Sequence, residues 1–202
     1  KERIEKLAKD TAEASGAEVR AHPCDVTDEG EVQALFADIR GAWGEPDLVA
    51  YNAGAFMPQS IMEAKLGDFE RCWRVLCLGG FLVGREVAKA MAERGSGTIL
   101  FTGATASLRG SAKFFNLAVG KFGLRALAQS MARELGPKGV HVAHIIIDGM
   151  ILSEHYADLA AARLPDGLLE PDGIAETYYQ IHLQQRSAWT LEIDLRPWVE
   201  KF

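Results

Sequence analysis

Residues 101–153 read FTGATASLRGSAKFFNLAVGKFGLRALAQSMARELGPKGVHVAHIIIDGMILS, and this stretch decides the fold. It opens at the end of a β-rich run over residues 97–104 that stops at a glycine-bearing turn. A helix-forming segment over 112–135 follows, and the longest β-branched run of the chain lies at 140–147. Two apolar strands joined by a helix are typical of a parallel sheet with helices on both faces.

The same alternation of strands and helices continues on both sides of this stretch. Short apolar or β-rich runs predict strands, and apolar residues at helical spacing predict helices. The further predicted elements, in chain order, are an amphipathic helix at the start, a strand over 17–23, a helix from Thr27, a strand over 46–54, a helix over 67–94, a helix from Pro171 and a strand over 190–195. No repeat, linker or change in composition divides the chain. We therefore expect a single α/β domain over residues 1–202, with a three-layer, doubly wound parallel sheet.

The composition is that of an ordinary soluble globular protein. Of the 202 residues, 48% are hydrophobic and 25% are charged, and the formal net charge is −6. Lys and Arg form no cluster that would suit a nucleic acid, and no stretch approaches the roughly 18 apolar residues of a membrane span. We therefore expect neither kind of partner. The three cysteines have no CxxC spacing, which argues against a disulfide framework or a metal site and favours a cytoplasmic protein.

Two short motifs lie where predicted strands end. In YNAG, Asn52 is followed by Ala53 and Gly54, which leave room for a ligand to approach the backbone. Open α/β sheets bind ligands outside the carboxyl ends of their strands, but a plain turn into the next loop also accounts for this motif. In CDVTDE, the Asp25 carboxylate could accept a hydrogen bond from an adenine amino group or cap the following helix.

One lysine stands out on the predicted helix over 112–135. Lys121 has small and apolar neighbours on both sides. In one interpretation, its aliphatic stem covers apolar surface while the charged end reaches solvent. In the other, its ammonium group reaches the crevice at the carboxyl edge of the sheet.

The order of these segments resembles that of the short-chain dehydrogenase/reductase family of nicotinamide-dependent oxidoreductases. The resemblance rests on CDV, NAG, the glycine-bearing strand end, the lysine-centred helix, ARELGPKGVHV and DG-x-I-x-S, and it covers essentially the whole chain. It implies a Rossmann-like fold, NAD or NADP as cofactor, a small-molecule substrate, and assembly into a homodimer or homotetramer. At the adenine end of the cofactor, it implies contacts from Asp25 and the Val26 backbone. Asn52, Ala53 and Gly54 would flank the adenine ribose and stabilise the central sheet.

At the nicotinamide end, the resemblance implies three further residues. Lys121 would hold the hydroxyls of the nicotinamide ribose and, as the catalytic lysine, lower the pKa of a tyrosine. Ile151 and Ser153 would bind the carboxamide. Asp148 stands where the family usually has a proline.

The chain departs from the family at the catalytic positions. Leu117 stands where the family has its tyrosine, Ala104 where it has its serine, and Leu76 where it has a supporting asparagine. Alanine and leucine side chains cannot exchange a proton, so tyrosine-mediated carbonyl reduction is excluded at these positions. The candidates for a relocated proton donor are Thr102, Thr105, Ser107, His155 and Tyr156.

A second departure concerns the beginning of the resembled fold. The family starts with a strand, a glycine-rich loop that holds the pyrophosphate, a helix and a second strand, and none of these is found here. A sheet without its first two strands would leave unpaired backbone groups on buried edges. We therefore expect the domain to be incomplete at its N-terminal side, with further residues upstream of Lys1 in the working protein.

These observations lead to three hypotheses about function. The first is an NAD(P)-dependent oxidoreductase of the short-chain dehydrogenase/reductase type with a divergent active site. The alternative is a catalytically weak module that binds a nicotinamide dinucleotide or serves in regulation. The third is a structural or assembly protein, but Asn52, Lys121, Ile151 and Ser153 favour the first two.

Overall fold

The computed structural model describes residues 2–153, 156 and 164–200. Its helices are α1 (Glu2–Ser15), α2 (Glu29–Trp43), α3 (Leu66–Trp73), α4 (Gly79–Arg94), α5 (Phe115–Leu135) and α7 (Pro171–His182). Its strands are β1 (Leu48–Tyr51), β2 (Thr98–Thr102), β3 (His141–Ile147) and β4 (Glu192–Leu195). The strands predicted from residue 46 onward are confirmed, each within a few residues of its expected ends. None of the helices described here has the length and apolar character needed to cross a membrane.

The four strands form one parallel sheet in the order β1-β2-β3-β4. The register places Ala50 beside Leu100 and Leu100 beside Ala143. Because the strands are parallel, the turns that follow them gather at one edge of the sheet. This is the α/β architecture with a parallel sheet that the sequence predicts.

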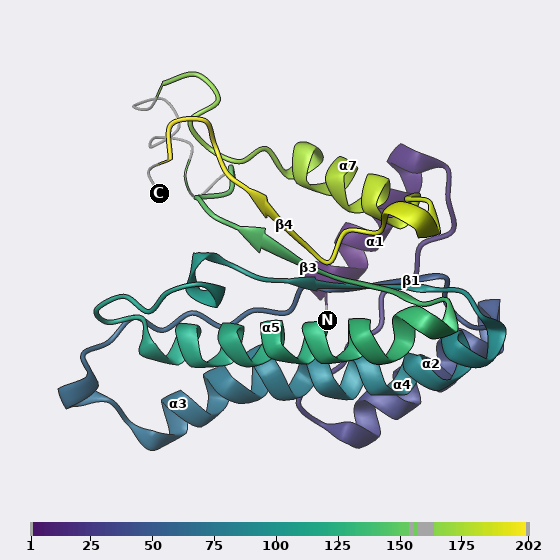
Figure 1. Cartoon of the computed structure of the whole chain (residues 1–202), viewed down its shortest axis with the longest axis horizontal. Helices are drawn as coiled ribbons and strands as arrows, with labels where there is room; N and C mark the ends of the chain where they lie inside the picture. The colour runs from purple at the N-terminus through teal and green to yellow at the C-terminus, as the bar shows by residue number, and fades with distance from the viewer. Residues whose placement is uncertain (1, 154–155, 157–163, 201–202) are drawn as a thin grey trace.

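Both faces of the sheet are covered, which explains why its central strands are almost entirely buried. Alternate residues of a strand point to opposite faces. Accordingly, Ile99 and Phe101 belong to one core cluster, whereas Leu100 and Ala143 belong to a second. Figure 1 shows α3, α4 and α5 on one side of the strands and α7 on the other.

The N-cap of helix α2 lies one residue after Thr27, from which the sequence predicts the helix. Asp28, not Thr27, is the N-cap residue, and its carboxylate accepts a hydrogen bond from the Glu31 amide at 2.9 Å. The Asp25 carboxylate accepts hydrogen bonds from the amide and the hydroxyl of Thr27, at 2.9 Å and 2.8 Å. Asp25 therefore closes the turn before α2 and does not cap it.

The helix predicted over 67–94 is continuous except for one wider turn. Helix α3 passes into a π-turn over Arg74–Leu78, and α4 continues from there. The Tyr51 hydroxyl donates a hydrogen bond to the carbonyl oxygen of Val75 and so ties the end of β1 to this turn. Such π-turns occur frequently at functional sites, and this one holds the fully buried Leu76.

The prediction of a strand over 17–23 is wrong, because these residues form no strand. A strand requires a hydrogen-bonded neighbour. In the described part of the chain, β1 is the last strand on that side of the sheet, and it pairs with β2 alone. The segment therefore lacks a strand to pair with, and β1 keeps an open edge where Leu48 and Ala50 are exposed.

Candidate functional site

The carboxyl edge of the sheet collects the turns in which the sequence predicts ligand-binding residues. The turn after β1 holds Asn52–Gly54, the turn after β2 leads into a short 3-10 helix over Thr105–Ser107, and the turn after β3 begins at Asp148. Two cavities open among these turns. We name them the Asn52 cavity, of 430 Å³, and the Leu117 cavity, of 380 Å³.

Lys121 places its ammonium group at this edge. The side chain arises from α5, the residue is only 6% exposed, and Nζ donates a hydrogen bond to the carbonyl oxygen of Thr102 at 2.5 Å. Thr102 is the last residue of β2, so the cation lies at the crevice and not over the outer surface. Burial lowers the pKa of Lys121 from its ordinary 10.5 to about 8. An ammonium group carries three N–H donors, and the Thr102 bond uses one of them. Lys121 lines neither of the two cavities.

The Asn52 cavity brings together two residues predicted to bind the cofactor. Asn52 and Ile151 line it from the turns after β1 and β3, and Ile174 and Tyr178 line it from α7. The Tyr178 hydroxyl lies 2.7 Å from Thr102 Oγ1. The walls are therefore mainly apolar, with a small number of polar groups where the strands end, as is usual for small-molecule sites.

The other predicted cofactor residues lie outside the lining of these two cavities. Ala53 is half-buried, and Gly54 is exposed. No heavy atom lies within 4 Å of the place where a Gly54 Cβ would stand, which leaves the backbone open to a ligand. Asp25 and Ser153 are exposed, and Val26 packs against the start of α4 at Gly79. The described structure thus gathers Asn52 and Ile151 but does not bring the adenine-side residues to them.

The Leu117 cavity contains two of the three apolar replacements. Ala104 and Leu117 both line it, so the positions of the expected serine and tyrosine face one space. Leu76 does not line this cavity. Its side chain is fully buried against Gly120, where an added Cβ would stand only 2.6 Å from the Leu76 Cβ.

The candidates for a relocated proton donor differ in where they lie relative to the two cavities. Thr102 pairs with Tyr178 beside the Asn52 cavity, and Ser107 is completely buried. Thr105 lines the Leu117 cavity. Tyr156 is 37% exposed and lies outside that lining. His155 lies outside the described residues.

Two polar groupings were not predicted as such. In the first, the Thr105 hydroxyl donates to Asp148 Oδ1, and Asp148 Oδ2 lies 3.2 Å from the Arg196 guanidinium. The unusual Asp148 was visible in the sequence, but its partners were not.

Within the described residues, no group of three or more His, Cys, Asp and Glu side chains could hold a metal ion.

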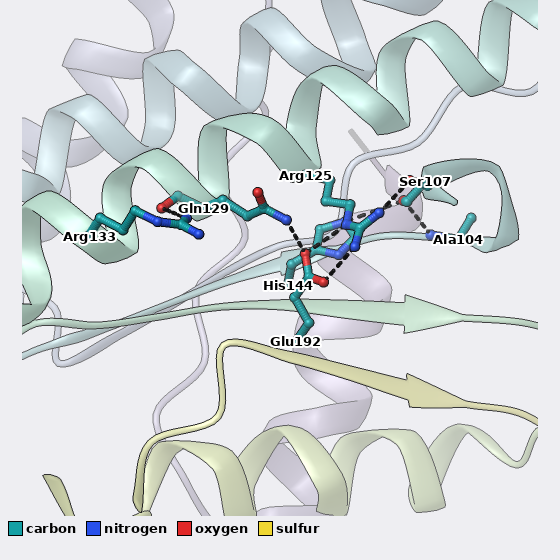
Figure 2. A network of polar contacts seen from close by, with 7 residues as sticks. All are labelled: Ala104, Ser107, Arg125, Gln129, Arg133, His144 and Glu192. Atoms are coloured by element: carbon teal, nitrogen blue, oxygen red, sulfur yellow. Dashed lines mark hydrogen bonds and ion pairs between the residues drawn. The ribbon is translucent and has the colours of Figure 1, made fainter. Parts of the chain in front are cut away.

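The second grouping is a chain of polar contacts behind the turn that follows β2 (Figure 2). Arg125 holds Glu192 through two hydrogen bonds of 2.7 and 2.8 Å, and these bonds lower the pKa of Glu192 to about 2. His144 is completely buried, and burial lowers its pKa to about 4. Its Nε2 lies 3.3 Å from Ser107 Oγ, which accepts a hydrogen bond from the Ala104 amide at 3.1 Å. A neutral histidine thus supports the turn that faces the Leu117 cavity.

Comparison with known proteins agrees with this fold. The chain matches the family model described as short chain dehydrogenase over residues 1–163. It is 30% identical over 156 residues to sorbitol-6-phosphate 2-dehydrogenase of Escherichia coli (strain K12), with 77% of this chain and 60% of that protein aligned. The short-chain dehydrogenase from Rhodopseudomonas palustris has a solved structure that is 38% identical, with a TM-score of 0.82 over 98% of this chain and 82% of that one.

A second solved structure shares the fold at lower identity. The alcohol dehydrogenase from the archaeon Thermococcus sibiricus, complexed with 5-hydroxy-NADP, has a TM-score of 0.84 and 23% identity over 99% of this chain and 83% of that one. This likeness supports the architecture alone. The chain spans about 60% of the length of the curated relatives it matches.

Proposed function

This chain belongs to the short-chain dehydrogenase family, and we propose that the working protein is an NAD(P)-dependent oxidoreductase with a divergent active site. One combination of observations carries the proposal. Lys121 stands at the carboxyl edge of the sheet, whereas Ala104 and Leu117 line the neighbouring cavity. A lysine is thus present where the resemblance places the ribose-binding lysine, whereas side chains able to transfer a proton are missing at positions 104 and 117.

The residues present fit a nicotinamide dinucleotide, which supplies or accepts a hydride when it is bound. Asn52 offers an exposed amide beside a mainly apolar cavity, and Gly54 leaves its backbone open. Lys121 offers N–H donors to ribose hydroxyls. The residues proposed to hold the cofactor are Asp25 and Val26 at the adenine, Asn52, Ala53 and Gly54 at the adenine ribose, Lys121 at the nicotinamide ribose, and Ile151 and Ser153 at the carboxamide.

The chain's own residues define what this site can do during hydride transfer. A ketone that receives a hydride also needs a proton, and a positioned acid typically contributes about 10²- to 10⁴-fold to the rate. Neither Ala104 nor Leu117 can donate one, so the resembled family's proton donors are missing from the wall of this cavity. Lys121 binds and orients the ribose. We therefore propose slow reduction of ordinary ketones.

The alternative proposal is a catalytically weak module that binds a dinucleotide or serves in regulation. Ala104, Leu117 and the buried Leu76 favour it, because all three stand where the resembled enzymes carry polar catalytic groups. The two proposals agree on binding and differ on turnover. Both require that Lys121 contribute to dinucleotide affinity.

Calorimetric titration of the full-length protein with NADH and NADPH tests the binding that both proposals share. We expect one dinucleotide to bind and Lys121→Ala to weaken it about tenfold or more, because hydrogen bonds from a charged donor are lost. Lys138→Ala is the matched control, since Lys138 is an exposed lysine on the turn after α5. Absence of binding to either dinucleotide by the wild type would refute both proposals.

Turnover of a panel of ketones and alcohols then separates the two proposals. Measurable turnover that falls in Lys121→Ala supports the oxidoreductase. Tight dinucleotide binding with no turnover of any compound supports the module. Rapid ketone reduction by the wild type contradicts the predicted effect of Ala104 and Leu117.

We further propose that the protein is a cytoplasmic homodimer or homotetramer. Large apolar side chains on α3, α4 and α5 support an interface between copies, with exposed fractions of 38–46% at Trp73, Phe81, Val119 and Phe122. The three cysteines are free, as suits a reducing compartment. Sedimentation velocity at micromolar concentration tests the assembly, and a stable monomer would count against it.

We also propose that the sheet has a further strand beside β1, on the edge that is open in the described structure. The support is physical, because Leu48 and Ala50 leave an exposed apolar edge next to the almost entirely buried strand β2, and such an edge is normally paired or covered. A further strand beside β1 would also give the segment over 17–23 the setting that the resembled fold requires. Residues 1–202 are proposed to belong to this single domain.

A further inference from the structure

The Leu117 cavity carries polar groups of its own where the family's relay is absent. Besides Ala104 and Leu117, its lining includes Thr105, Asp148 and, near the end of the described chain, Glu200. Polar and apolar side chains therefore share one space of 380 Å³. A cavity of this size and character suits a small hydroxylated molecule.

Thr105 and Asp148 form a directional pair at the wall of this cavity. The Thr105 hydroxyl donates a hydrogen bond to Asp148 Oδ1, so the lone pairs of Thr105 Oγ1 remain able to accept a hydrogen bond. The second oxygen of Asp148 faces Arg196 at 3.2 Å, and its side chain is only 8% exposed. The guanidinium offsets the cost of burying the carboxylate.

The backbone that carries Thr105 is fixed from behind. Ser107 Oγ accepts from the Ala104 amide and touches His144 Nε2 (Figure 2). The ring of His144 leaves no room for a side chain at position 103, where a Cβ would stand 2.3 Å from Cε1. These contacts immobilise the turn, so the Thr105 hydroxyl has a defined position relative to Asp148. A fixed hydrogen-bonded pair of this kind is what general acid–base catalysis requires.

We propose that Thr105 and Asp148 are the proton-exchange pair of this site and that they serve the oxidation of a small alcohol. The proposal rests on the dinucleotide-dependent function proposed above, and it gives the site a proton acceptor for alcohol oxidation. Because that acceptor is a carboxylate, which has no proton to give, ketone reduction remains slow. Thr105 is the group that touches the substrate oxygen. Asp148 is the final proton acceptor within the protein.

The step balances in atoms and electrons. The substrate hydroxyl gives its proton to Thr105 Oγ1 while Thr105 passes its own proton to the Asp148 carboxylate. The carbon-bound hydrogen leaves with its electron pair for the oxidised nicotinamide. The products are a carbonyl compound, the reduced dinucleotide and a protonated Asp148, which returns its proton to water.

The test measures kcat for alcohol oxidation and dinucleotide affinity in the same set of full-length proteins. The probes are 2-propanol, cyclohexanol, glycerol and sorbitol, with whichever dinucleotide the wild type binds. Thr105→Val removes the hydroxyl at nearly constant volume, and Asp148→Asn removes the acceptor. We expect each to lower kcat about 10²- to 10⁴-fold while the dinucleotide Kd changes less than about threefold. Thr105→Ser keeps the hydroxyl and should retain kcat within about tenfold.

Asp194→Asn is the matched control. Asp194 pairs with the same Arg196, but it does not line the Leu117 cavity. This variant therefore removes a carboxylate from the ion-pair cluster without touching the proposed relay, and it should keep kcat within about twofold of wild type.

Formate rescue separates a relay from a mere structural tie between turns. Formate should restore part of the kcat of Asp148→Ala, because a small carboxylate can occupy the vacated space, but it should not restore that of the double variant Thr105→Val/Asp148→Ala. If the carboxylate only tied Arg196 to this turn, formate would act equally in both variants. If Asp148→Asn fails to fold, the kcat and dinucleotide Kd of Thr105→Val test the proposal without it.

Three results would overturn the proposal. They are wild-type kcat in either relay variant, a loss of kcat matched by an equal loss of dinucleotide affinity, and a wild type that binds dinucleotide but oxidises none of the probes. Failure of the wild type to bind dinucleotide is a different outcome, because it removes the proposed function itself.

Discussion

Replacing Lys121 with methionine should make the protein more stable and its dinucleotide binding weaker. The side chain is 6% exposed and makes one hydrogen bond, to the Thr102 carbonyl oxygen, within the described residues. Burial holds its pKa at about 8, against an ordinary 10.5. The folded state therefore disfavours the charged lysine relative to the unfolded state, and methionine removes that cost while keeping a similar length.

The magnitude follows from the difference between the two pKa values. At about 1.36 kcal/mol per pKa unit, the charged form costs roughly 3 kcal/mol below pH 8. Loss of the hydrogen bond to Thr102 lowers the free energy of unfolding by about 1 kcal/mol. We therefore expect the free energy of unfolding of Lys121→Met to exceed that of the wild type by about 2 kcal/mol near pH 7. The unfolded chain binds the extra proton between about pH 8 and 10.5, so wild-type stability rises with pH across that window and the advantage of the variant disappears.

Urea unfolding of both proteins, followed by circular dichroism from neutral pH to about pH 10.5, measures this difference. Other groups that titrate in this range do so in both proteins, so their effects cancel when the two curves are subtracted. Lys138→Met, at an exposed lysine, should show no such pH-dependent difference. A destabilised Lys121→Met at neutral pH, or a stability difference constant across the window, would refute the reasoning.

Three further predictions concern the site and its supports. Leu117→Tyr combined with Ala104→Ser should raise ketone reduction about 10²-fold or more, at an overpacking cost of about 1–3 kcal/mol; unchanged dinucleotide consumption with a ketone panel would contradict it. Gly120→Ala should destabilise by about 1–3 kcal/mol, because its Cβ would stand 2.6 Å from the buried leucine of the π-turn, whereas Gly41→Ala, which meets no atom within 4 Å, should not; thermal unfolding of both compares them. Glu192→Gln should remove a contribution of about 1–2 kcal/mol that the wild type has above pH 4.5 and loses as the pH falls towards 2; unfolding midpoints that change equally with acid in both proteins would show that the carboxylate contributes nothing.

The parts of the fold that follow from local patterns were predictable. The β-branched run at 140–147 reads as a strand because each of its residues is buried on one face or the other. Helix α7 begins at Pro171, where a proline costs no hydrogen bond. The strand expected over 17–23 fails for a non-local reason, since no local pattern reports whether a neighbouring strand is present.

The site divides in the same way. Lys121 stood out because it is a lysine with small and apolar neighbours on a predicted helix. The pairing of Thr105 with Asp148 was not recognisable, since 43 positions separate the two residues and their contact depends on the register between β2 and β3. The support from His144 was likewise hidden, because a histidine inside a β-branched run has no local signature of what it faces.

The open edge of β1 has a consequence for handling the purified chain. Backbone groups along Leu48–Tyr51 pair on one side with β2, and exposed strand edges are templates on which a second chain can add. Pairing at this edge would increase with protein concentration, and any exposed strand of another molecule could take part in it. The isolated chain should therefore aggregate as it is concentrated, which light scattering would detect. A short synthetic peptide that pairs with this edge and carries a charged residue on its outer side should prevent the aggregation.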